Sequence, residues 1–187
     1  MPLNYPVIYK TDDTKSDAIV QGAIAGCVAD AEALWQPEKF DGVYATKGFG
    51  IKKLEKWDIV YSCAASCGPF SNSWVISIDT ARTWQVIFSG TMSDHYIILT
   101  GVFNYDAAPD VEAIAIVAEG IEYFPINLQE MYGWDEATAY LSHPVVVRPD
   151  KKILIYAKAE TAGRKKFGFL GYTVAKRGYL INRQSGT

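Results

Sequence analysis

Only two histidines, His95 and His143, are available for acid–base or metal chemistry in this chain. Ser93 and Asp94 precede His95 directly, but adjacent side chains of an extended segment point to opposite faces, so the three do not have the geometry of a catalytic triad. We expect each histidine to stand at the entry to a β-strand. The sequence therefore predicts no catalytic residue and a protein that is not an enzyme.

The three cysteines are Cys27, Cys63 and Cys67. Structural zinc sites usually need four ligands, which a C-x3-C pair, one distant cysteine and two scattered histidines do not supply in a known spacing. A buried thiol pair or an occasional disulfide is the preferred interpretation of Cys63 and Cys67. The segment 47–53 contains two glycines between lysines, but it is not a Walker motif and is expected to form a hairpin or strand-edge turn. No metal and no cofactor is predicted.

Acidic side chains at Glu119, Glu122, Asp135 and Glu136 could pair as in a glycoside hydrolase. Such a pair is defined by its separation in space, which sequence does not give. We interpret these carboxylates as solvated surface.

Basic residues concentrate near the C-terminus: from Pro144 onward ten Lys/Arg face two acidic residues, although the whole chain has a net charge of −3. Arg164, Lys165 and Lys166 lie between two predicted strands and are expected to form a positively charged hairpin tip. Such a tip could contact an anionic partner, including the phosphates of a nucleic acid. A salt-bridged or solvated tip is the preferred alternative, because no aromatic residues alternate with the bases.

Aromatic residues are abundant, with five Trp, twelve Tyr and eight Phe. Trp74, Trp84, Tyr132 and Trp134 are the candidates for aromatic contact with a ligand, although most aromatics are expected in the core.

One amphipathic helix is predicted before Pro37. Its N-cap is expected among residues 12–14, with Asp17 in the first turn and an end at Trp35 or Gln36. Apolar residues with helical spacing should cover one face: Val20, Ile24, Cys27, Val28, Ala31 and Leu34. Gly22 and Gly26, four residues apart, could admit another backbone. No secretory signal and no membrane span is expected, so the localisation predicted from these features is the inside of a cell.

After residue 37 the pattern changes to short apolar runs separated by turn residues. The predicted strands are Gly42–Thr46, Trp57–Cys63, Trp74–Asp79, Thr83–Ser89, His95–Asn104, Val111–Ala118, Pro144–Val147, Ile153–Ala159, Phe167–Val174 and Gly178–Ile181. Residues 120–141 are expected to form a long excursion with helical turns near 128–132 and 136–141. The fold class predicted is mainly β, as an antiparallel β-sandwich or jelly-roll-like barrel. It forms one domain, with residues 1–36 as arm and helix and 37–187 as the sandwich.

The run from Trp84 to Ile181 resembles the late strands of single jelly-roll virion proteins. The resemblance rests on the segments 85–90, 95–104 and 145–181, in which a Pro-Asp turn feeds a long strand and a Gly-studded apolar strand follows. It implies a structural protein of a capsid or virion whose partners are other copies of itself, with other structural proteins possible. The rival hypothesis is a carbohydrate-binding β-sandwich. A cupin-like enzyme ranks third, because two histidines do not make a histidine-rich metal set.

Overall fold

The computed structural model describes residues 8–9, 17–35, 49–59, 74–104, 106, 110–123, 125–129 and 138–176. Within these ranges twelve strands and two helices follow one another along the chain. Their bounds are β1 (Ile8–Tyr9), α1 (Ala18–Trp35), β2 (Phe49–Lys53), α2 (Lys56–Ile59), β3 (Ile76–Ile78), β4 (Gln85–Thr91), β5 (His95–Asn104), β6 (Val111–Ala118), β7 (Ile121–Glu122), β8 (Ile126–Asn127), β9 (Thr138–Val147), β10 (Lys152–Ala159), β11 (Gly163–Lys165) and β12 (Phe167–Lys176).

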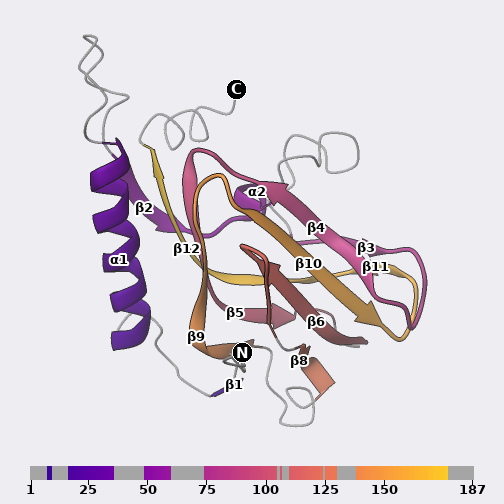
Figure 1. Cartoon of the computed structure of the whole chain (residues 1–187). Coiled ribbons are helices and arrows are strands. Elements are labelled where there is room, and N and C mark those ends of the chain that lie inside the picture. Colours follow the sequence, from indigo (N-terminus) through magenta and orange to yellow (C-terminus); the bar gives the residue numbers. More distant parts are fainter. Residues whose placement is uncertain are drawn as a thin grey trace.

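Two antiparallel sheets pack face to face (Figure 1). The first has the order β1-β9-β5-β12-β2, and we call it the covered sheet because α1 lies on its outer face. The second has the order β4-β10-β6-β7, with β8 also paired to β6, and we call it the open sheet. A short third pair joins β3 to β11. The predicted antiparallel β-sandwich with one N-terminal helix is confirmed.

The strands pair as one long nested hairpin. Counting inward from its two ends, β2 pairs with β12, β4 with β10, β5 with β9, and β6 with β7 and β8. Each of the three inward steps between these four pairs moves from one sheet to the other, so the hairpin is rolled up across both layers. This winding is that of a jelly roll.

The tip of the nested hairpin is a two-residue loop. Ala118 pairs with Ile121, and between them Glu119 and Gly120 both have positive φ, 55° and 80°. Positive φ at both loop positions is the type I′ turn, whose twist matches that of the flanking strands. The glutamate carboxylate accepts a hydrogen bond from the backbone N–H of Arg148 at 2.7 Å, which ties the tip to the turn between β9 and β10.

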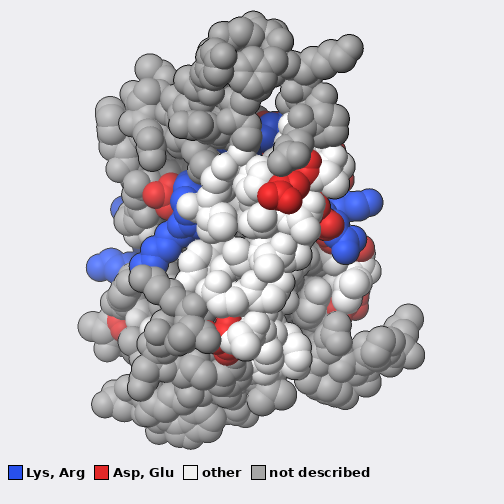
Figure 2. Space-filling model, turned by 90° about the vertical axis from the view of Figure 1, so that its left-hand side faces the viewer, with Lys and Arg blue, Asp and Glu red and all other residues white. Residues whose placement is uncertain are grey.

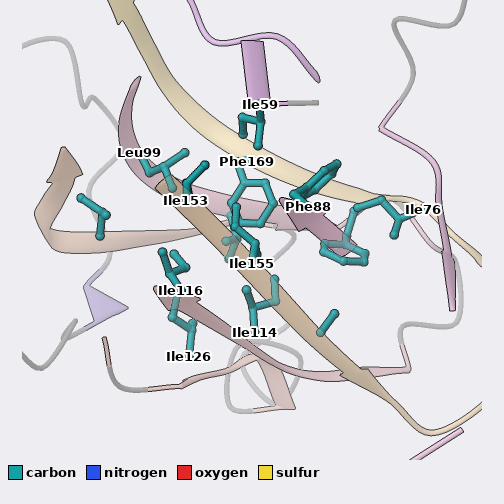
Figure 3. Close-up of a cluster of buried hydrophobic side chains, with 14 of the residues drawn as sticks. Ile59, Ile76, Phe88, Leu99, Ile114, Ile116, Ile126, Ile153, Ile155 and Phe169 are labelled. Carbon is teal, nitrogen blue, oxygen red and sulfur yellow. The ribbon is translucent and has the colours of Figure 1, made fainter. Parts of the chain in front are cut away.

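The main core fills the space between the two sheets. Strand alternation turns Ile153 and Ile155 of β10 inward, toward Leu99 of β5 and Phe169 of β12, and all four are almost fully buried (Figure 3). Ile59 of α2 closes one end of this cluster. Buried apolar residues of eight strands thus form one continuous core: β3, β4, β5, β6, β8, β9, β10 and β12.

Helix α1 begins after Asp17, whose carboxylate Oδ1 accepts hydrogen bonds from the N–H groups of Ile19 and Val20 at 2.8 and 3.3 Å. Asp17 is therefore the N-cap, which corrects its predicted place in the first turn. The helix runs to Trp35, as predicted. By length and composition alone α1 could cross a membrane. In this fold five of its side chains pack on the covered sheet: Val20, Ile24, Cys27, Ala31 and Trp35.

Strand β5 is buried along its whole length, as its continuous apolar run predicted. Ile97 and Leu99 face the core between the sheets, whereas Tyr96 and Ile98 face α1. The indole ring of Trp35 meets the ring of Tyr96 edge-on at a centroid distance of 5.6 Å. Burial on both faces explains why this strand lacks polar alternation.

Several element predictions are wrong, for local reasons. Residues 57–59 belong to α2 and not to a strand, because the Asp58 carboxylate accepts the backbone N–H of Glu55 at 2.8 Å and stabilises a helical turn. The segment 49–53 is strand β2 rather than a turn. The turn predicted over 136–141 is wrong from Thr138 onward, where β9 begins.

Strand β9 is longer than predicted and includes Pro144 in its interior. Its ladder to β5 shifts between Tyr140 and Val145, so the proline lies where no β5 partner is needed. His143 therefore lies inside this strand and is exposed, not at a strand entry. The predicted strands 42–46 and 178–181 lie outside the described residues.

Candidate interaction surfaces

The basic segment 164–166 is not the hairpin tip that the sequence predicted. Strand β10 belongs to the open sheet and β12 to the covered sheet, so the chain between them crosses from one layer to the other. On the way β11 pairs with β3, placing Arg164 opposite Ser77. A turn followed by two apolar strands has the same sequence signature whether the strands pair with each other or lie in different sheets.

Lys165 is buried and is removed from the set of anion-contacting candidates. Its ammonium Nζ lies 2.6 Å from Asp110 Oδ2 and 2.7 Å from Thr161 Oγ1, and the threonine hydroxyl also donates to the same carboxylate. Burial works to raise the pKa of Asp110, but the hydrogen bonds from Lys165 and Thr161 outweigh it and the pKa falls below its usual value. This triad joins the β11 segment to the start of β6.

Arg164 and Lys166 are exposed, so two of the three predicted bases remain on the surface. The backbone N–H of Lys166 donates to the Asp106 carboxylate at 2.8 Å, and the Asp110 carboxylate pairs with Lys165 of β11 at 2.6 Å. Acidic groups therefore accompany this segment, which weakens its attraction for a polyanion.

Trp74 is a packing residue, which corrects its prediction as a ligand contact. Its ring meets the rings of Phe88, Phe103 and Phe169 edge-on at centroid distances of 6.2, 6.0 and 5.9 Å. Gly168 makes room for it, because a Cβ at that position would lie 2.4 Å from the indole ring. Tyr132 and Trp134 lie outside the described residues.

Trp84 is the predicted aromatic candidate that the structure leaves exposed, at 42% of its surface. Alternation places it on the outer face of the open sheet, two residues before Val86, which is 52% exposed. Val86 stands opposite Tyr156, and Tyr156 opposite Ala115. In the next row Ser89 stands opposite Leu154, and Leu154 opposite Val117.

We call this surface the open face; its outward apolar residues are Trp84, Val86, Ala115, Val117, Leu154 and Tyr156. At its margins β10 carries Lys152, which is exposed, and Lys158, which pairs with Glu112. A solvent-facing sheet surface normally alternates apolar-in with polar-out. The run Ile153–Ala157 breaks that rule at Leu154 and Tyr156. The sequence analysis did not predict the open face, and this break is the signal that could have indicated it.

Helix α1 has a second uncharged surface on the side away from the sheet. We call it the helix ridge; its exposed residues are Ala18, Gly22, Ala25, Gly26, Ala29 and Ala33. A Cβ added at Gly22 or Gly26 would meet nothing within 4 Å, so neither glycine serves contact within this chain. Figure 2 views this side of the molecule and shows its centre uncharged, with charged side chains toward the margins.

Both sides of α1 are thus poor in polar groups. Of the predicted apolar face, Val28 is half-buried and Leu34 is 57% exposed, so the prediction of Leu34 on the buried face is wrong. Ile19, at the start of the helix, is 48% exposed. The exposed polar residues of α1 are Gln21, Asp30 and Glu32, which lie beside the helix ridge. An apolar stripe on the solvent side of a helix is usually covered by a partner. The only charged side chains from Asp17 to Trp35 are three acids, Asp17, Asp30 and Glu32.

A buried polar network lies at the end of the sandwich near α2. His95 opens β5 as predicted, and its Nε2 lies 2.7 Å from the backbone oxygen of Asp58. The Asp58 carboxylate, fully buried, pairs with Lys52 at 3.0 Å and accepts the hydroxyl of Thr173 at 3.2 Å. Burial lowers the pKa of His95, partly opposed by Asp58. The network joins α2 to β2, β5 and β12, and holding these elements together explains why its polar groups are buried.

Within the described residues no three His, Cys, Asp or Glu side chains gather in a way that could hold a metal ion. Cys27 is a free cysteine on the buried side of α1, and burial raises the pKa of its thiol to about 11. Glu119 bonds to Arg148 at the hairpin tip, and Glu122 is exposed on β7. Cys63, Cys67, Asp135 and Glu136 lie outside the described residues.

Comparison of the chain with protein-family models, with curated proteins and with solved structures found no match. The interpretation of its function therefore rests on the two surfaces described above.

Proposed function

We propose that this protein is a self-assembling structural subunit, of the kind that builds a capsid or virion, and that it has no catalytic role. The observation that carries the proposal is α1, which covers the outer face of one sheet and is itself apolar on the side that faces away. In a monomer that side would stay in water, where an apolar helix surface contributes nothing to stability.

Two further features support assembly. The open face gives the same molecule a second apolar surface, on the opposite side of the sandwich from α1. The jelly-roll winding matches what the resemblance to virion proteins implied, and the fold by itself is compatible with many functions.

The test is the mass of the purified protein by multi-angle light scattering, over a hundredfold range of concentration and at two salt concentrations. The proposal predicts a defined oligomer or larger shell that grows with concentration. A monomer under every condition would refute it.

A second candidate, carbohydrate binding, is favoured by one observation. Trp84 and Tyr156 lie on the same open face, and flat aromatic surfaces of this kind stack on sugar rings. Soluble polysaccharides would then quench tryptophan fluorescence in the native protein and not in Trp84→Ala. If quenching is absent in both, this candidate is eliminated.

A further inference from the structure

The structure offers two apolar surfaces of opposite shape on opposite sides of one molecule. The helix ridge is smooth, since its side chains are hydrogen atoms or methyl groups. The open face carries protruding side chains, with Trp84 and Val86 42% and 52% exposed. Small residues on a helix let a partner approach its backbone closely, and large side chains fill the space they leave.

We propose that the helix ridge of one copy docks on the open face of a second copy of this chain. The inference rests on the proposed self-assembly and names its contact. It extends a packing that the molecule already uses, because the other side of α1 covers the covered sheet in the same way. A helix between two sheets would then have both of its apolar sides buried.

The distribution of charge favours a second copy of this chain as the partner of the helix ridge. Asp30 and Glu32 flank the C-terminal part of the ridge and are exposed, and α1 has no basic residue. On the open side, Lys151 and Lys152 are exposed at the start of β10. Two exposed acids, Asp150 and Glu122, lie near these lysines, so the acidic end of α1 is complementary to Lys151 and Lys152 themselves and not to a uniformly basic surface. A lipid surface, which attracts basic helices, does not fit an acidic one.

The size of the contact decides what kind of assembly follows. A helix of 18 residues is about 27 Å long and about 10 Å wide, so one contact covers much less than the ~800 Å² that each partner contributes to a stable interface. One such contact is weak. Because the two surfaces differ, every copy makes two contacts, and these close into a ring or propagate as a filament.

Cysteine cross-linking tests the contact directly. Ala25→Cys places a thiol on the ridge, and Ser89→Cys places one on the open face beside Leu154. Isotope-labelled Ala25→Cys protein is mixed with unlabelled Ser89→Cys protein, oxidised and mapped by peptide mass spectrometry. The unsubstituted chain, treated alike, gives the background from the native cysteines.

The expected result is a link between positions 25 and 89 that joins a labelled to an unlabelled chain. Links only between two copies of position 25, or only between two copies of position 89, would show a symmetric contact and overturn the inference while self-assembly stands. Oligomers without any of these links would also overturn it. A monomer would overturn both proposals.

Val86→Glu provides an independent measurement. A charge on β4, at the edge of the open face, should raise the concentration for half-assembly at least about tenfold, the equivalent of losing one buried aliphatic side chain. Ser77→Glu, at the one exposed position of β3, is the matched control and should leave that concentration unchanged. Equal behaviour of the two variants would contradict the open face as the contact, and circular dichroism confirms that each variant is folded.

Discussion

The structural role of Lys165 is set by residues that are distant from it in sequence. In sequence it is the middle of three bases; in the fold its side chain is 7% exposed and held by Asp110, so it stabilises the connection between the sheets. Nothing in the local sequence distinguishes it from Arg164 and Lys166. The distinction comes from Asp110, which lies 55 positions away in sequence.

Lys165→Met should therefore destabilise the protein by about 2–3 kcal/mol, because the Asp110 carboxylate loses its partner while it remains partly buried. The range is below the value for a fully buried pair, since Asp110 is 21% exposed. Urea unfolding of Lys165→Met, Asp110→Asn and the double variant gives the coupling free energy. Additive losses would contradict an energetic link between the two residues. Lys166→Met is the exposed control.

His95 predicts a dependence of stability on pH. Burial lowers its pKa below 6.5, so the unfolded chain takes up a proton at a higher pH than the folded one does. The free energy of unfolding should then be full above about pH 6.5 and should fall on acidification, by at most about 1.4 kcal/mol per pH unit. Lys52, Asp58 and Asp94 surround this group and modulate the effect.

The measurement is urea unfolding at several values between pH 7.5 and pH 5. His95→Gln keeps a donor toward Asp58 and should reduce the loss below pH 6.5. His143→Gln, which removes the exposed histidine, is the control and should keep it. An unchanged slope in His95→Gln would contradict the assignment.

Glycines in α1 and β12 have opposite roles at the scale of elements. Gly22 and Gly26 have open space around them, so Ala at each should stabilise the isolated chain by about 1 kcal/mol through helix propensity. Gly168→Ala should destabilise it by about 1–3 kcal/mol, because its Cβ would overlap the Trp74 ring.

Thermal unfolding at a concentration below assembly checks all three substitutions. A loss of stability in Gly22→Ala would mean that the helix ridge is contacted within the chain, which the open space around it contradicts. For Gly168→Ala, an unchanged melting temperature would show that Trp74 moves without cost.

The elements that the sequence predicted correctly are those with one dominant local signal. β5 and β6 match their predicted bounds, and α1 ends at the predicted residue. The errors occur where a distant contact decides. β2 follows a Gly-Lys pattern typical of a turn, and it becomes a strand because β12 pairs along all five of its residues. The exposure of Trp84 and the packing of half-buried Trp74 against the core likewise depend on which residues the fold brings beside each ring.

At the scale of the whole molecule, the nested hairpin brings together strands that are far apart in sequence. Lys53 pairs with Tyr172 at one end, whereas Ala118 pairs with Ile121 at the other. Contacts over such separations are slow to form, because loop-closure entropy must be overcome first. Folding in milliseconds to seconds is expected. In the part of the chain that the structure describes, β6 and β7 are consecutive strands that pair through a two-residue turn, so we expect strand pairing to begin at Glu119 and Gly120.

Gly120→Ala should therefore slow folding several-fold and change the unfolding rate little, because its φ of 80° is needed as soon as the hairpin tip forms. Gly163, whose φ is 122°, is the matched control. It is the first residue of β11, in the connection from β10 to β12 that completes the outer pairs of the nested hairpin. Gly163→Ala should chiefly raise the unfolding rate. Stopped-flow folding and unfolding in urea separates the two effects. If Gly163→Ala slows folding more than Gly120→Ala does, the rolled hairpin does not form from its tip, and pairing instead begins between the chain's distant strands.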